Sequence, residues 1–96
     1  MASEDKLRID ADRGARAKAL LSNELLQEAF DSLEKDLLLE WRGTGPADQQ
    51  RREDAWRSLK LLENIRGGLR RVVTTGESAG KQLLKIEKPS ILKSLS

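Results

Sequence analysis

The sequence predicts an all-α protein whose body is an antiparallel helical hairpin. Apolar residues recur every three or four positions in two long stretches, Glu24–Arg42 and Gln49–Thr75, which is the spacing of one helix face. The turn signal Gly43–Pro46 lies between them, and Gly43 suits the left-handed C′ position that ends a helix. A connection this short places two helices side by side in opposite directions, so the pattern indicates a hairpin.

The first helix of the hairpin is predicted to start near Asp10, a suitable N-cap residue, after a flexible segment at residues 1–9. The dipeptide Ser22-Asn23 interrupts its apolar pattern, and both residue types favour helix caps. Two interpretations remain open, because one helix can run through to Arg42 or a short helix can end here and a second begin. We favour a break or kink at this dipeptide.

The second helix is expected to end at Gly76, which makes residues 10–76 the hairpin domain. A glycine-rich segment follows, and residues 77–96 are expected to form a short basic helix and a tail. Gly67 and Gly68 lie inside the second helix, where each costs ~1 kcal/mol relative to alanine. We expect them to mark a close crossing between helices, with a local kink as the alternative.

Several kinds of chemistry are excluded by residue types that the sequence lacks. Without cysteine there is no disulfide or thiolate site, and without histidine the usual general base and the commonest transition-metal ligand are missing. No apolar run approaches the ~20 residues that span a bilayer, and the acidic start lacks the apolar core of a secretory signal. We therefore expect a protein without catalytic residues, metal or cofactor, and without membrane contact.

Two short matches to catalytic motifs are rejected on physical grounds. Residues 76–80 match Gly-x-Ser-x-Gly around Ser78, but that motif requires a strained strand-to-helix turn and a histidine. The same glycines with Lys81 resemble a phosphate loop, but the spacing is one residue short and Gln82 stands where a hydroxyl should bind magnesium. Neither match predicts an activity.

Self-association is expected because a two-helix hairpin buries only one seam. A short chain without disulfides is marginally stable. Apolar residues that face away from the contact between the two helices can be buried against another copy or against a different structural protein. We therefore predict a homo-oligomer. The expected contact residues are Leu38, Leu39, Leu61, Gly67, Gly68 and Val73.

Charge is distributed unevenly along the chain. Residues 1–65 carry 11 Lys/Arg and 14 Asp/Glu, a net of −3, whereas residues 66–96 carry 7 and 2, a net of +5. A basic C-terminal third indicates an acidic partner or a nucleic acid, unless it is simply a solvated lysine-rich end. The residues predicted to make such contacts are Arg66, Arg70, Arg71, Lys81 and Lys85.

Several helix-packing patterns of the sequence occur together in one group of proteins. They are the run Ala19–Phe30, the pairs Leu33-Glu34 and Trp41-Arg42, and the stretch Leu59–Gly76, which ends in Val-Val-Thr-Thr-Gly. With these patterns, residues 11–85 resemble small uncharacterised helical proteins of tailed bacteriophages and prophages. Such genes often neighbour those for portal, scaffold and capsid, so the resemblance implies a role in the virion or its assembly, and a location in the host cytoplasm or the virion. It implies no functional residues.

These observations together predict a non-enzymatic, self-associating helical protein that serves as a phage virion or head-assembly component through protein–protein contacts. The alternative is a small DNA- or RNA-binding accessory factor, for packaging or regulation, that uses the basic C-terminal third.

Overall fold

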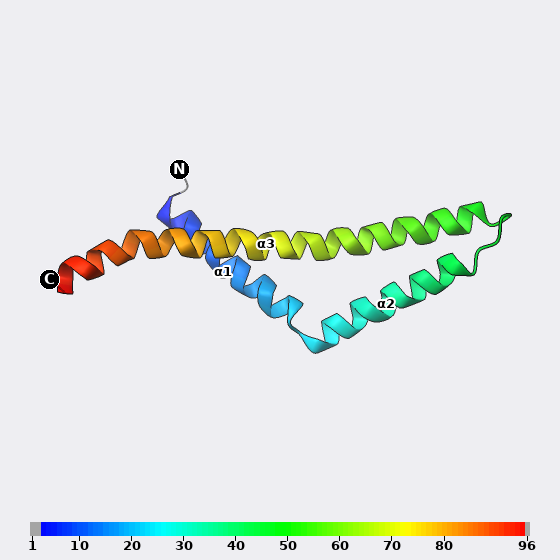
Figure 1. Cartoon of the computed structure of the whole chain (residues 1–96), viewed down its shortest axis with the longest axis horizontal. Coiled ribbons are helices and arrows are strands. Elements are labelled where there is room, and N and C mark those ends of the chain that lie inside the picture. Colours follow the sequence, from blue (N-terminus) through cyan, green and yellow to red (C-terminus); the bar gives the residue numbers. More distant parts are fainter. Residues whose placement is uncertain (1–2, 96) are drawn as a thin grey trace. The chain divides into compact units, whose positions relative to one another are not determined.

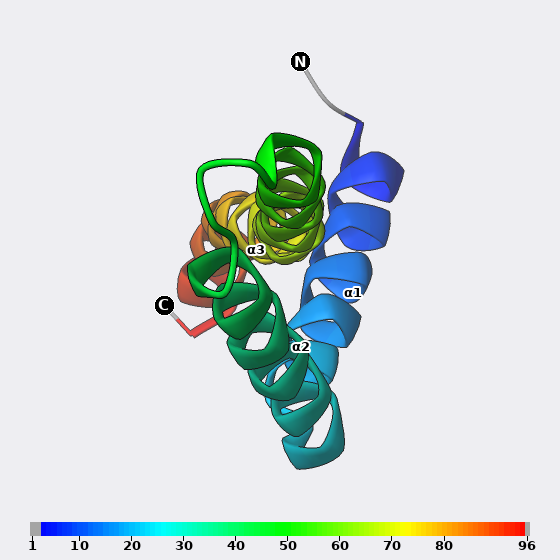
Figure 2. The ribbon, with the colours of Figure 1, turned by 90° about the vertical axis from the view of Figure 1, so that its right-hand side faces the viewer.

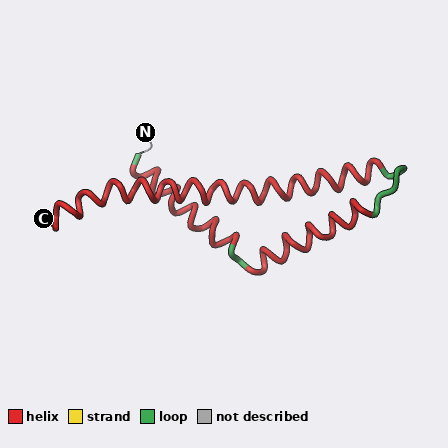
Figure 3. Tube along the Cα trace, in the orientation of Figure 1, coloured by secondary structure: helices red, strands yellow, loops and turns green. Residues whose placement is uncertain are grey.

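The computed structural model describes the backbone over residues 3–95 and the side chains over residues 3–86, and within this range it contains three α-helices and no strand (Figures 1 and 3). Helix α1 spans Glu4–Leu21, α2 spans Glu24–Arg42 and α3 spans Gln49–Leu95. The all-α prediction is confirmed.

The chain forms two compact units. Unit 1 comprises Met1–Ala19 and Leu69–Ser96, and unit 2 comprises Leu20–Gly68. Helix α3 belongs to both units, because it is continuous from Gln49 to Leu95. Unit 2 therefore contains α2 and the first part of α3, whereas unit 1 contains most of α1 and the rest of α3.

The break between α1 and α2 lies where the sequence predicts it. Helix α1 ends at Leu21 and α2 begins at Glu24. Asn23 is the N-cap of α2: its backbone is extended, with φ −71° and ψ 121°, and its side chain accepts a 3.0 Å hydrogen bond from the Leu26 N–H. The Gln27 side chain also donates to the Leu21 carbonyl at 2.8 Å, so it closes the end of α1. The predicted interruption at Ser22-Asn23 is confirmed.

Replacement of Asn23 by alanine is expected to lower the free energy of unfolding by ~1 kcal/mol, because the Leu26 N–H loses its cap. Urea denaturation followed by circular dichroism measures the change. Asn23→Asp is the matched control, since aspartate caps equally well and should preserve stability. Equal loss in both variants would show that the cap is not the cause.

The start of α1 differs from the prediction. The helix begins at Glu4 and not near Asp10, because Ser3 caps it: the Ser3 hydroxyl accepts from the Lys6 N–H at 3.2 Å. Glu4 and Asp5 occupy the first turn, where negative charge favours the helix N-terminus. The expected start at Asp10 is wrong, and most of the segment that we expected to precede the helix belongs to α1.

The loop between α2 and α3, nearest the viewer in Figure 2, contains no left-handed residue. Gly43 ends α2 in the right-handed region, with φ −76° and ψ −4°, and its N–H donates to the Leu39 carbonyl at 2.9 Å. The Thr44 hydroxyl then donates to the Trp41 carbonyl at 2.6 Å. The expected left-handed Gly43 is therefore wrong, because other donors satisfy the last carbonyls of the helix.

Arg52 ties this loop to the first turn of α3. Its guanidinium donates to the Gly45 carbonyl at 2.7 Å and to the Thr44 hydroxyl at 3.2 Å. Asp48 precedes α3 and accepts the Gly45 N–H at 3.2 Å through its carboxylate. The loop is thus fixed by side chains of the helix that follows it.

Helix α3 continues through the segment that was expected to end it. Gly76 and Gly80 lie inside the helix, which runs to Leu95. The predicted short C-terminal helix and tail at residues 77–96 is wrong over the described residues. The reason is tertiary: Gly76 is buried against α1, and packing outweighs the low helix propensity of glycine.

Two glycines allow α1 and α3 to approach closely in unit 1. A Cβ atom added to Gly14 would lie 2.6 Å from the Gly76 Cα and 3.1 Å from the Val72 carbonyl oxygen. A Cβ atom added to Gly76 would lie 2.5 Å from the Gly14 Cα. Ala17 and Ala79, each three residues further along its helix, are also buried. The small side chains therefore determine the separation of the two backbones.

In unit 2, ion pairs join α2 to α3 in opposite order along the two helices. Glu40 pairs with Arg51 at 2.7 Å. Glu34 lies six residues before Glu40, and it pairs at 2.8 Å with Arg66, which lies fifteen residues after Arg51. The two helices are thus fixed in register at two levels, one of which lies close to the loop.

Candidate association surfaces

Most large apolar side chains of unit 2 are exposed. Among its described residues, only Ala55 and Leu62 are buried apolar residues. The exposed ones are Leu20, Leu25, Leu33, Leu38, Leu39, Trp41, Trp56, Leu61 and Ile65. Apolar residues exposed in this number are typical of a surface that contacts another protein.

Three of these residues form one surface, which we call the outer patch: Leu33, Leu61 and Ile65. Leu33 directly precedes Glu34, and Ile65 directly precedes Arg66, so the two lie level with the ion pair that joins the helices. Since the helices run in opposite order, both side chains project on the same flank of the pair. Leu61 follows on that flank, one turn from Ile65 on α3.

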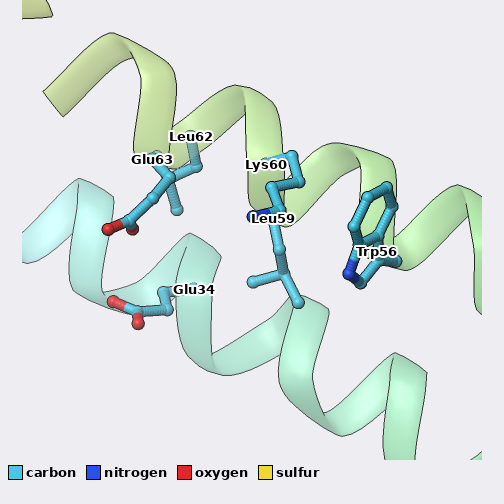
Figure 4. A pocket seen from close by; sticks show the side chains of 6 residues that line it. All are labelled: Glu34, Trp56, Leu59, Lys60, Leu62 and Glu63. Carbon is cyan, nitrogen blue, oxygen red and sulfur yellow. The ribbon is translucent and has the colours of Figure 1, made fainter. Parts of the chain in front are cut away.

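The opposite flank of unit 2 contains a shallow groove of about 260 Å³, which we call the Trp56 groove. Nine residues separate Trp56 from Ile65, which places them on opposite sides of α3 at 3.6 residues per turn. The groove is lined by Glu34, Trp56, Leu59, Lys60, Leu62 and Glu63. Figure 4 shows the Glu34 and Glu63 carboxylates at one end, the Trp56 ring at the other and Leu59 between them. The Lys60 Nζ lies 5.4 Å from the centre of the Trp56 ring.

The predicted contact residues do not gather on one surface. Leu38 and Leu39 line a second groove, of about 280 Å³, on α2, and this groove shares Glu34 with the Trp56 groove. Leu61 belongs to the outer patch. Gly67, Gly68 and Val73 are half-buried residues within α3. Self-association through any of them stays a prediction.

Arg66 is engaged within unit 2. Its guanidinium pairs with Glu34 at 2.8 Å and with Asp31 at 3.1 Å, and lies 5.2 Å from the Phe30 ring centre. The hydrogen bond to Glu34, followed by the Glu34 and Asp31 charges, raises the pKa of Arg66 above its ordinary value. Arg66 is one of the five cations predicted to contact an acidic partner molecule. Its guanidinium is instead paired with two carboxylates of its own unit.

Replacement of Arg66 by alanine is expected to lower the free energy of unfolding by ~1–2 kcal/mol, because it removes charged hydrogen bonds and a ring contact at a side chain only 15% exposed. Arg16→Ala is the matched control. The Arg16–Asp12 pair is exposed on one helix, so its loss should cost ~0.5 kcal/mol or less. Urea denaturation compares the two, and equal effects would contradict the special role of Arg66.

The Glu40–Arg51 pair near the loop is exposed on both sides. The hydrogen bond from Arg51 and its charge lower the pKa of the Glu40 carboxyl. A lowered pKa means that the pair contributes to stability above the unfolded pKa and loses this contribution as the pH falls through the folded pKa. Since solvent screens the pair, its contribution to stability is small.

The four remaining predicted cations lie on unit 1 and are exposed: Arg70, Arg71, Lys81 and Lys85. At 100° per residue, these four side chains lie about 120° to 180° around the α3 axis from Gly76, and Gly76 packs against α1. The basic side chains thus face away from α1. This arrangement gives unit 1 a basic surface on α3.

The close glycine crossing in unit 1 is a feature that we did not predict. Gly76 was expected only to end the second helix of the hairpin. A usable signal is present: both helices contain Gly-x-x-Ala, at Gly14 and Ala17 and at Gly76 and Ala79. Small residues three positions apart lie on the same helix face and permit close packing.

The rejected Gly-x-Ser-x-Gly match lies entirely within α3. Ser78 therefore lies on regular helical backbone and not on the strained strand-to-helix turn of a nucleophile. Its hydroxyl accepts a 3.5 Å hydrogen bond from the Gln82 Nε2, one turn further along the helix. Among the described residues, no three acidic side chains are grouped so that they could hold a metal ion, and no helix is both long and apolar enough to cross a membrane. Comparisons with known protein families, curated proteins and solved structures find no match.

Proposed function

We propose that the chain is a non-enzymatic, self-associating helical protein, built on an antiparallel helical hairpin, that acts through protein–protein contacts. The observation that carries the proposal is the outer patch: Leu33, Leu61 and Ile65 are 48%, 63% and 55% exposed on one flank of a unit with a very small core. Burial of this patch against another copy removes apolar surface from water and adds the core that the unit lacks.

The size of this effect shows that the outer patch is not sufficient for tight association. A half-exposed leucine or isoleucine gains roughly 1 kcal/mol on burial, so three from each of two copies give roughly 6 kcal/mol. Association costs roughly 4–15 kcal/mol in lost translational and rotational freedom. The patch alone therefore supports weak association, and a stable oligomer requires a second contact.

Analytical ultracentrifugation tests the proposal. We expect the weight-average mass to exceed that of one chain and to rise with concentration from the micromolar range upward. A species that stays monomeric over this range, and remains folded by circular dichroism, would overturn self-association.

Gly67 and Gly68 are expected to take part in the association through a close helix crossing. Replacement of both by alanine should stabilise the helix by ~2 kcal/mol, because alanine is the better helix former. The added methyl groups should also weaken the oligomer in the same ultracentrifugation measurement. If association is unchanged, the glycines have no role in a crossing.

The assembly in which the protein takes part is proposed from the resemblance to small tailed-phage proteins. We place it in the virion or in head assembly, with a location in the host cytoplasm or the virion and another phage structural protein as a further partner. Mass spectrometry of purified particles and the identity of neighbouring genes test this. Portal and capsid genes beside it support the proposal, and replication or recombination genes contradict it.

A second candidate function is nucleic-acid binding, which the basic surface of unit 1 favours. Arg70, Arg71, Lys81 and Lys85 are exposed and face away from α1, as contacts to a phosphate backbone require. A gel shift with duplex DNA and with RNA at low salt tests it. Binding should weaken steeply as salt rises, and absence of any shift disposes of this candidate.

A further inference from the structure

Helix α2 has an exposed face that points away from α3. The Phe30 ring and the Glu34 carboxylate of α2 both contact the Arg66 guanidinium of α3. Ser32 lies about 200° around the α2 axis from Phe30 in one direction and from Glu34 in the other, at 100° per residue. The Ser32 side chain is therefore on the side of α2 opposite the contacts with α3, and it is exposed.

Two leucines and two opposite charges share this face with Ser32. Leu25 and Leu39 lie seven residues before and after Ser32, which brings both within about 20° of it, and they are 75% and 56% exposed. Glu28 and Lys35 are also exposed, and they lie about 40° and 60° from Ser32 in the same direction, on one edge of the face. We call these five residues the Ser32 face.

The two charges on this edge are not used within the chain. Neither the Glu28 nor the Lys35 side chain makes an ion pair or a hydrogen bond with any described residue, 3–86. The neighbouring Asp31 and Glu34 carboxylates differ, because both are bound by Arg66. The Ser32 face therefore carries one acid and one base that are available to another molecule.

We propose that two copies of the chain pair through the Ser32 face, with their α2 helices antiparallel and a twofold axis at Ser32. The axis places Leu25 of each copy opposite Leu39 of the other, since both lie seven residues from it. The same edge of the two helices meets, so Glu28 of one copy lies about 1.5 Å along the helix axis from Lys35 of the other. The inference rests on the proposed self-association and supplies the second contact that the outer patch requires.

The charges favour the antiparallel arrangement. A parallel pair with Ser32 opposite Ser32 brings Glu28 against Glu28 and Lys35 against Lys35, and like charges repel. In the antiparallel pair the acidic half of the edge meets the basic half. Glu24 and Arg42 extend this edge, and Glu24 of one copy lies about 3 Å along the axis from Arg42 of the other. Asp36 lies on the opposite edge, away from Glu28 of the second copy.

A second copy fits the Ser32 face better than a nucleic acid does. The edge carries two acids, Glu24 and Glu28, which repel a polyanion, whereas a twofold contact requires a surface that is complementary to itself. The outer patch lies on another side of unit 2, since Leu33 is about 100° around α2 from Ser32. A copy that uses both surfaces therefore contacts two neighbours, and the assembly is larger than a dimer.

Charge reversal on the edge tests the contact in the full chain. Glu28→Lys sets the introduced lysine against Lys35 of the second copy, and Lys35→Glu sets the introduced glutamate against Glu28. Each variant alone should raise the dissociation constant, measured by sedimentation equilibrium, by roughly tenfold, because two symmetry-related pairs become repulsive. An equimolar mixture of the two variants should restore the wild-type affinity, and so should one chain with both substitutions, because every pair again joins an acid and a base.

Arg71→Glu is the matched control for these variants. It changes the net charge by the same amount as Lys35→Glu, but at an exposed cation of unit 1. The wild-type dissociation constant should be kept. All three positions are exposed, so folding should be retained, as circular dichroism and urea denaturation verify.

The absence of native cysteine allows a second measurement. Ser32→Cys should give a disulfide-linked dimer under mild oxidation, because the two introduced thiols meet at the twofold axis. Glu28→Cys is its control: in the antiparallel pair the two copies of this residue lie about 12 Å apart along the axis, too far for a disulfide. In a parallel pair both variants would cross-link.

The outcomes separate the inference from the proposed function. A wild type that is monomeric overturns both. A wild type that associates, with both charge reversals at the wild-type dissociation constant and no disulfide through Ser32→Cys, overturns the α2 contact and leaves self-association standing. Reversals that weaken association without rescue in the mixture or in the double variant show that the two charges do not pair between copies, and Glu28→Cys that cross-links as readily as Ser32→Cys shows a parallel pair. Either result contradicts the inference.

Discussion

Alanine at Gly14 or at Gly76 is expected to lower the free energy of unfolding by about 2 kcal/mol, although alanine is the better helix former. The propensity gain is ~1 kcal/mol. Against it, each new Cβ would lie 2.5–2.6 Å from a backbone Cα of the facing helix, where no flexible side chain can move away. The helices must separate, and such overpacking typically costs 1–3 kcal/mol after the local gain is included.

Gly80→Ala is the control for this prediction. Gly80 also lies within α3, but an added Cβ meets no atom within 4 Å. Alanine there should stabilise the protein by up to ~1 kcal/mol. Urea denaturation of the three variants should therefore show opposite signs for Gly80 and for the crossing glycines. A stabilised Gly14→Ala or Gly76→Ala variant would contradict the close crossing.

Replacement of Leu61 and Ile65 by glutamine is expected to weaken self-association at least a hundredfold. Loss of roughly 1 kcal/mol at each of two positions in each of two copies amounts to roughly 4 kcal/mol, or between two and three powers of ten in the dissociation constant. The stability of the monomer should change little, because both side chains are largely exposed. Sedimentation equilibrium measures the dissociation constant.

Leu39→Gln distinguishes the two flanks of unit 2. Leu39 is 56% exposed but lines the groove on α2 and not the outer patch. We expect it to weaken association less than the double change at Leu61 and Ile65. The reverse order of effects would show that association uses the α2 groove, and the outer patch would lose its assigned role.

Local signals in the sequence predicted the interruption at Ser22-Asn23 and the loop at Gly43–Pro46. Both depend on residues close in sequence: Asn23 caps the helix that begins at the next residue, and glycine and proline disfavour helix. The start of α1 could also be predicted from neighbouring residues, because a serine such as Ser3 followed by two acidic residues is typical of a helix N-terminus. The polar composition of the first residues outweighs this signal in the prediction, because the ends of a chain are often poorly ordered.

Features that depend on distant contacts did not follow from local signals. Gly76 and Gly80 predict a helix end by propensity, but α1 covers Gly76 and α3 continues. The sequence groups Arg66 with the other cations of the basic C-terminal third, yet two carboxylates of α2 bind it. Leu38 and Leu61 were grouped as exposed leucines, and the register of α2 against α3 places them on different surfaces.

The sharing of α3 by both units has a consequence for the order of folding. Contacts within unit 2 close short loops, since Glu40 and Arg51 are 11 positions apart and Glu34 and Arg66 are 32 apart. Gly14 and Gly76 are 62 positions apart. Short loops close at a lower entropic cost, so unit 2 should form first and present a helix that elongates toward Gly76 one residue at a time. Helix α1 then docks last, and its amides should be the first to exchange with solvent under native conditions.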